Sequence, residues 1–141
     1  MCTIISIGRD QEARRFRYFI ETEIMEGVNT WTFWVQPIDQ ELIESFEFRV
    51  NEVNAETAKV MMINRHDEAA YQAMGIPEAL IEEASRILRR TIISSSNLSN
   101  AKIFKNERRE HSATKIWLRL EADNRARYDE INDIYIYQTV L

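Results

Sequence analysis

The sequence predicts an α/β fold of the α+β kind, with a mixed, mostly antiparallel central sheet and one parallel strand–helix–strand crossover. Strand-like patterns fill most of residues 14–63, where aromatic, β-branched and polar residues are interleaved. A helical period follows at 77–90, between two short apolar runs at 58–63 and 91–95. Two strands that are joined through a helix pair in parallel by a right-handed crossover, so this unit would set the topology.

The whole chain, residues 1–141, is predicted to form a single domain. This length is usual for one domain, and no linker, repeat or low-complexity tract divides the sequence. Cys2 is the single cysteine, which excludes an intramolecular disulfide. The apolar run at 3–7 is too short for a secretory signal, and no segment approaches the roughly 20 apolar residues of a membrane span. We therefore expect a cytoplasmic protein without a membrane partner.

The charge of the chain argues against nucleic acid as a partner. The formal net charge is −5, and an acidic chain is a poor general partner for a phosphate backbone. Short basic clusters occur at 14–17, 89–90 and 108–109, but glutamates are interleaved with them. This pattern is typical of a solvated surface.

The first half of the chain predicts an antiparallel meander. Residues 14–24 and 30–36 are rich in aromatic and β-branched side chains, and Gly27 in their connection is typical of a hairpin loop. Apolar and charged residues alternate at 46–50, which indicates a strand with one solvated face. The continuous apolar run at 58–63 is typical of a strand buried on both faces.

The second half predicts two helices and three strands. The first helix begins at Pro77, because the fixed φ of proline suits the first helical position. A short buried strand follows it at 91–95, and Ser112 is placed to cap a second helix. Strand-like runs at 126–128 and 134–140 are joined by a turn rich in Asp and Asn, which predicts a final hairpin.

Gly75 marks the most informative position, where the strand at 58–63 leads into the helix that begins at Pro77. Unpaired N–H groups and the positive end of the helix dipole make a helix start an anion site. A glycine there allows a ligand to approach the backbone closely. The alternative is that Gly75 only permits a turn before an ordinary helix.

The segment at 71–80, Tyr-Gln-Ala-Met-Gly-Ile-Pro-Glu-Ala-Leu, resembles the GNAT superfamily of acyl-CoA N-acyltransferases. The signature of that family is Gln/Arg-x-x-Gly-x-Gly/Ala between its fourth strand and the next helix, and Gln72 and Gly75 match it. The family's next strand, its later helix and its final hairpin have counterparts in outline. The resemblance covers about residues 46–141 and is strongest at 71–95.

The resemblance implies a GNAT-like fold that binds acetyl-CoA or another acyl-CoA as cosubstrate. In the family, backbone amides before the helix grip the CoA pyrophosphate. The positions that this implies as cofactor-binding here are Met62, Ile63, Gln72, Ala73, Met74, Gly75, Ile76, Pro77 and Asn97. The implied activity is direct transfer of an acetyl or acyl group to the amine of a small molecule or peptide. The sequence identifies neither that amine nor a catalytic residue.

Two departures from the family pattern bear on the chemistry. Pro77 stands where the family has its last Gly or Ala, which removes one backbone donor from the phosphate cradle. Trp117 stands where many members carry a tyrosine that returns a proton to the CoA thiolate, which leaves that role to Tyr128 or a water. Both departures favour the alternative, a catalytically inactive interaction or regulatory module.

The two histidines, His66 and His111, lack a second nitrogen or sulfur ligand at metal spacing, so no metal site is predicted. His66 and Glu68 follow the strand at 58–63, which makes either one a candidate base facing a cleft at the end of that strand. Part of the aromatic and apolar surface could pair two chains across an exposed strand edge, as in a homodimer.

Overall fold

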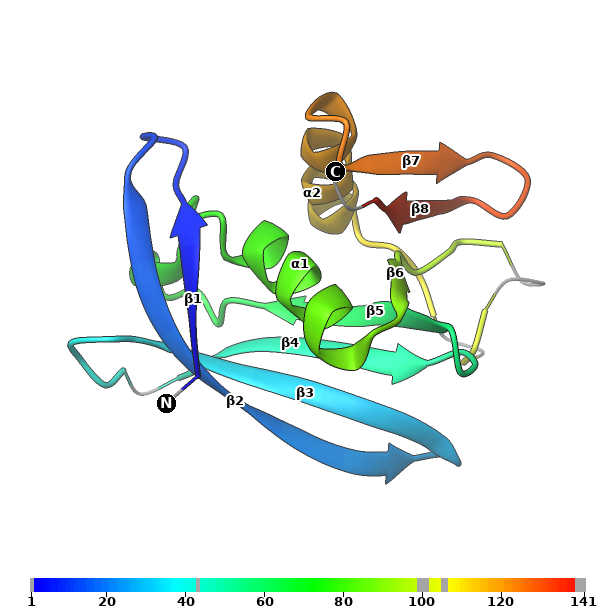
Figure 1. Cartoon of the computed structure of the whole chain (residues 1–141), viewed down its shortest axis with the longest axis horizontal. Helices are drawn as coiled ribbons and strands as arrows, with labels where there is room; N and C mark the ends of the chain where they lie inside the picture. The colour runs from blue at the N-terminus through cyan, green and yellow to red at the C-terminus, as the bar shows by residue number, and fades with distance from the viewer. Residues whose placement is uncertain (1, 43, 99–101, 105–106, 139–141) are drawn as a thin grey trace.

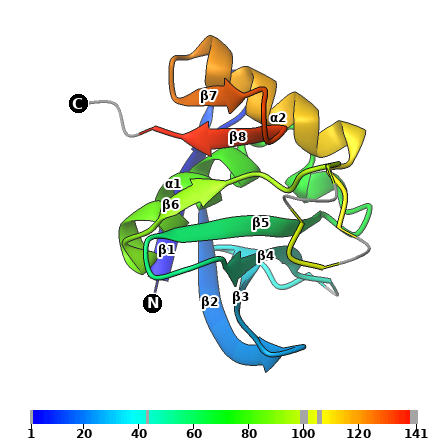
Figure 2. The same cartoon turned by 90° about the vertical axis from the view of Figure 1, so that its right-hand side faces the viewer.

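The computed structural model describes residues 2–42, 44–98, 102–104 and 107–138. Eight strands form one sheet in the order β1-β2-β3-β4-β5-β6-β8-β7, which curls into a half-barrel (Figures 1 and 2). The strands are β1 (Cys2–Ile7), β2 (Ala13–Met25), β3 (Val28–Pro37), β4 (Phe46–Glu52), β5 (Thr57–Asn64), β6 (Thr91–Ile93), β7 (Ala126–Asp129) and β8 (Ile134–Tyr137). The helices are α1 (Ile76–Leu88) and α2 (His111–Ala122), and a single 3-10 turn, η1 (Ala69–Tyr71), precedes α1.

The predicted GNAT-like α/β class is wrong. Of the described residues, 42% lie in strands and 21% in helices, and the structure is mostly one curled sheet. The prediction underestimated how much of the chain forms strands. β1 adds a fifth strand ahead of the helices, and the long β2–β3 hairpin extends the sheet further. Twist accumulates along such strands, and it bends the sheet around a helix. The result differs from a sheet that forms a layer between helices.

The concave face of the sheet packs against α1. Phe33 on β3 and Phe48 on β4 have no exposed surface, and their rings meet edge to face at 5.7 Å. Leu80 and Ile81 of α1 are also completely buried in the same core. Apolar residues at helical spacing thus form the buried side of α1, which fixes the direction of its N-terminus.

Strand β1 lies at one edge of the sheet and is held to the turn before α1. It pairs with β2 in antiparallel register from Cys2 opposite Tyr18 to Ile7 opposite Ala13. Just beyond its end, the N–H of Arg9 donates to the main-chain oxygen of Ala73 at 3.0 Å. The edge strand and the α1 entrance are therefore one local unit.

Strands β5 and β6 are parallel neighbours, but their ladder is short. Only three residue pairs form it, and the last joins Lys59 to Ile93. At that point the Lys59 ammonium forms an ion pair of 3.0 Å with Glu107, and the two side chains are 2% and 0% exposed. The Glu107 carboxylate also accepts the N–H groups of Ser96 and Ile103, both at 2.8 Å. This buried network fastens the segment after β6 to β5.

None of the helices in the described part of the chain has the length and apolar character needed to cross a membrane.

The substitution Glu107→Gln is expected to lower the free energy of unfolding by about 3–5 kcal/mol. It removes the negative charge that faces the buried Lys59 ammonium, and breaking a buried ion pair from one side is costly. Urea denaturation measures the change. The double variant Lys59→Met/Glu107→Gln removes both charges and should recover most of the loss. A single variant as stable as the wild type would contradict the expected effect of this pair.

Candidate functional site

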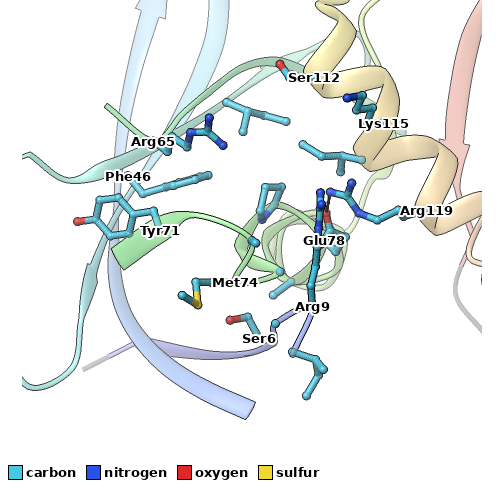
Figure 3. A pocket seen from close by; sticks show the side chains of 18 of the residues that line it. Ser6, Arg9, Phe46, Arg65, Tyr71, Met74, Glu78, Ser112, Lys115 and Arg119 are labelled. Carbon is cyan, nitrogen blue, oxygen red and sulfur yellow. Dashed lines mark hydrogen bonds and ion pairs between the residues drawn. The ribbon is translucent and has the colours of Figure 1, made fainter. Parts of the chain in front are cut away.

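A first cleft, with a volume of about 850 Å³, opens where the end of β1, the turn before α1 and one side of α2 meet. Figure 3 shows this cleft from close by, with Arg9, Arg65 and Lys115 around it and Met74 at its wall. Its lining combines residues from the two ends of the chain, because the curled sheet brings β1 and α2 to the same end of α1. Among the described residues, no group of three or more His, Cys, Asp or Glu side chains could hold a metal ion.

The N-terminus of α1 opens toward the first cleft. Gly75 is the N-cap with φ 74°, and the first intrahelical bond runs from the Ala79 N–H to the Gly75 oxygen at 3.2 Å. Pro77 is therefore the second helical residue, one position later than the sequence predicts. The N–H groups of Ile76 and Glu78 have no acceptor among the described residues, while Pro77 has no N–H to offer. The helix start thus supplies two backbone donors and the positive end of a dipole.

Gly75 is required by the packing of the protein's own backbone. A Cβ at this position would lie 2.2 Å from the main-chain oxygen of Ile7, well inside contact distance. The positive φ adds a second reason for glycine. The space that the missing side chain leaves is filled by β1, so the glycine alone does not indicate a ligand.

Cationic side chains without ion-pair partners give the first cleft its character. Arg9, Arg65 and Lys115 line it, are exposed, and make no ion pair with other described residues. The lining residues Glu78 and Glu82 are neutralised by Arg119 at 3.1 Å and Arg125 at 2.9 Å. Asp67 and Asp123 are the remaining lining carboxylates, so the unpaired charge is three cations against two anions. A positive excess at one cleft is unexpected in a chain of net charge −5 and favours an anionic ligand.

His66 lies two residues beyond the end of β5 and lines the first cleft. Its Nε2 is 3.6 Å from Glu47 Oε1, and its Nδ1 is 3.8 Å from Glu44 Oε2. His66 and Asp67 both have positive φ, 52° and 57°, a conformation that costs energy for residues other than glycine. The neighbouring Glu68 does not line the cleft. Of the two candidate bases from the sequence, only His66 faces this space.

The hydroxyls of Tyr71 and Tyr128 are both engaged in hydrogen bonds within the protein. Tyr71 lines the first cleft, but its hydroxyl donates to the main-chain oxygen of Glu44 at 2.8 Å, and burial raises its pKa. Tyr128 donates to Asp133 at 2.6 Å, and this hydrogen bond raises the pKa of Tyr128. Tyr128 lines neither this cleft nor the second one described below. Neither hydroxyl is placed to protonate a group bound in the first cleft.

A second cleft, of about 380 Å³, lies along β4 and β5 and is closed on one side by α2. Arg49 and Asn51 of β4 line it together with Met61 of β5. Ile63 and Ala113 line both clefts, so the two spaces adjoin across the open end of the β5–β6 ladder. A β-bulge interrupts the β4–β5 pairing beside the second cleft, because Arg49 faces Met62 while Val50 faces Val60. Met61 is the extra residue of that bulge.

The structure separates the residues that the sequence predicts as cofactor-binding. Met62 lines the second cleft, whereas Gln72 is exposed and Ile76 is fully buried, outside both clefts. Asn97 is also outside both, since its N–H donates to Asp133 at 3.0 Å and its Oδ1 accepts from the Arg109 N–H at 3.0 Å. The predicted residues that line the first cleft are Ile63, Ala73, Met74, Gly75 and Pro77.

Sequence reasoning missed the contributions of β1 and α2 to the first cleft. The missed lining residues include Ser6, Gly8, Arg9, His111, Ser112, Lys115 and Arg119. The only local signal was the Gly8-Arg9-Asp10 turn after an apolar run, which marks the end of a strand. Nothing in that turn indicates that it meets the α1 entrance.

Comparison with known proteins gives no match to a family model, a curated protein or a solved structure.

The substitution Gly75→Ala should destabilise the protein more than Gly27→Ala. Both glycines have positive φ, 74° and 79°, but a Cβ at Gly27 would meet nothing within 4 Å. The Gly27 variant should lose about 1–2 kcal/mol from its left-handed backbone alone. The Gly75 variant must also displace the Ile7 carbonyl, so its loss in urea denaturation should be at least about twice as large. Equal losses would show that β1 does not pack tightly on Gly75.

Proposed function

We propose that the first cleft binds acetyl-CoA or another acyl-CoA by its phosphate groups. The observation that carries this proposal is the set of three unpaired cations, Arg9, Arg65 and Lys115, around a helix start with unpaired N–H groups. Phosphates are the anions that helix N-termini and Arg or Lys side chains bind best. CoA is elongated and carries three phosphate groups, so several separated cations suit it better than one.

Size and sequence add support to this ligand class. The volume of about 850 Å³ lies within the range of small-molecule sites. Of Gln72 and Gly75, which carry the resemblance to the signature of acyl-CoA N-acyltransferases, Gly75 lines this cleft and Gln72 does not. The resemblance is confined to such motifs, because the architecture is a curled sheet and not the α/β class that the family implies.

The proposed reaction is transfer of the acyl group to the amine of a small molecule or peptide. His66, which lines the first cleft beside Glu47, takes the proton that the amine loses as the new C–N bond forms. The C–S bond of the thioester breaks, and CoA leaves as a thiolate. The proposal includes a cytoplasmic location, which the single cysteine of the chain favours.

A second candidate is binding of acyl-CoA without transfer. The hydroxyl of Tyr71 is engaged by the backbone, and Tyr128 lies outside both clefts. Trp117, where the resembled family has its acid, offers only an indole N–H. A departing thiolate therefore finds no tyrosine acid among the described residues of the clefts, which favours a regulatory module.

Acetyl-CoA is expected to raise the melting temperature of the wild-type protein by several degrees. A ligand at about 100 times its dissociation constant stabilises the native state by about 2.7 kcal/mol. Pantetheine, which lacks the phosphate groups, should give no shift at the same concentration.

Arg9→Gln and Lys115→Gln should each weaken binding about tenfold, because each removes one charge-assisted contact. The matched control Arg15→Gln removes a charge that is also exposed but lies outside the cleft, and it should bind normally. Absence of a shift at millimolar acetyl-CoA, or an equal shift with pantetheine, would rule out this ligand.

His66→Asn is expected to slow acyl transfer by about 10²–10⁴-fold while acetyl-CoA still binds, because the variant lacks the base. Release of free thiol across a panel of amines measures the rate. His111→Asn is the matched control, since His111 also lines the first cleft but lies at the start of α2. Equal rates in the two variants would remove His66 from the mechanism. Acetyl-CoA binding without thiol release from any amine would favour the regulatory module.

A further inference from the structure

The second cleft contains buried polar atoms whose hydrogen-bonding capacity is unused. Asn51 is 1% exposed, and its Nδ2 donates to Thr30 Oγ1 at 2.7 Å, which fixes the orientation of the amide. Its Oδ1 has no hydrogen-bond partner among the described residues. Arg49 binds Glu47 through Nη2 at 2.7 Å, while its Nε is likewise buried and unpaired. Each such atom costs about 1–3 kcal/mol when it stays unpaired, so a pair of them at one cleft requires an explanation.

The two atoms are complementary in kind and lie on the same side of β4. Arg49 and Asn51 are two residues apart on the strand, so their side chains point to one face. One atom is a donor and the other is an acceptor. An amide group satisfies both, because its oxygen accepts from Arg49 Nε and its N–H donates to Asn51 Oδ1.

The charges that line the second cleft are already paired, which indicates a neutral ligand. Arg49 is paired with Glu47, and Glu107 with Lys59. The remaining lining charges, Arg108 and Glu110, are paired with each other at 2.8 Å. A charged ligand would have to break one of these pairs or remain unneutralised. This cleft therefore differs from the first, where three cations are unpaired.

Apart from Ser95, the rest of the lining is apolar and adaptable. Its large apolar side chains include those of Met25, Met61, Met62, Phe104 and Trp117. Asn51 Oδ1 and Arg49 Nε each expose less than 1 Å², so a ligand reaches them by displacing side chains at the cleft surface. Methionine suits this purpose, because its unbranched chain changes rotamer at low cost.

We propose that the second cleft is a binding site for an uncharged ligand that combines an amide group with an apolar body, such as a capped apolar amino acid. Asn51 and Arg49 hold the amide, and the methionines enclose the apolar part. A volume of about 380 Å³ suits a ligand of this size. The site does not depend on which ligand occupies the first cleft.

Isotope-labelled methionine methyl groups allow a direct NMR test on the full chain, with N-acetyl-L-leucinamide as the probe. Met25, Met61 and Met62 line the second cleft, whereas Met74 lines the first and serves as the internal control. Titration should shift the signals of the three second-cleft methionines and leave Met74 unchanged. N-benzylacetamide should also bind, whereas benzyl acetate, which has the same apolar body but an ester in place of the amide and so no N–H donor, should bind about tenfold more weakly. Equal binding of amide and ester, a shift confined to Met74, or no shift at the solubility limit would overturn the proposal.

Two variants separate recognition by Asn51 from its structural role. Asn51→Ala removes the unpaired acceptor and should abolish the preference for the amide over the ester. Thr30→Val removes the partner of Asn51 Nδ2, so it causes a comparable structural loss but leaves Oδ1 in place and should keep the preference. Arg49→Lys retains the charge opposite Glu47 without the Nε donor, and it should also weaken amide binding. Retention of the preference in Asn51→Ala, its loss in Thr30→Val, or unchanged amide binding in Arg49→Lys would show that Asn51 and Arg49 do not read the amide.

Discussion

The buried ion pair between Lys59 and Glu107 lies where the β5–β6 ladder ends, and both clefts adjoin at the open end of that ladder. The parallel ladder of β5 and β6 ends at Lys59. Beyond that point the Glu107 carboxylate connects the segments, because it binds the Lys59 ammonium and the N–H groups of Ser96 and Ile103. The segment after β6 is thus held to β5 by side-chain bonds and not by strand pairing. Ile63 lies farther along β5 and lines both clefts.

The contact between Gly75 and Ile7 changes how the α1 entrance should be interpreted. From the sequence, a glycine before a helix start suggests a ligand close to the backbone. In the structure the same glycine accommodates a carbonyl of the edge strand, which fully accounts for it. The case for an anion therefore rests on the unpaired cations. Arg9 is one of them, and the bond from its N–H to Ala73 makes it part of the same β1–α1 contact.

Local patterns predicted where most elements lie, because period and turn chemistry are local properties. The segments at 14–24, 30–36 and 58–63 fall within β2, β3 and β5. The fold class was beyond such reasoning, since sheet curvature and the position of helices come from packing between distant segments. Capping was also predicted wrongly, because α2 starts at His111 with Glu110 as its N-cap, and Ser112 is already helical.

The candidate site divides in the same way between local and distant information. The turn at 73–77 was found from its own sequence, because glycine and proline mark a helix start. The cations Arg9 and Lys115 come from opposite ends of the chain and meet only after the sheet has curled. Trp117, which seemed a loss of catalytic chemistry, is buried and stacks on Tyr135 of β8 at 6.1 Å. Ala113 precedes it by one helical turn and lies on the same face of α2. By anchoring that face, Trp117 sets the position of a residue that borders both clefts, so its size has a structural reason independent of any acid.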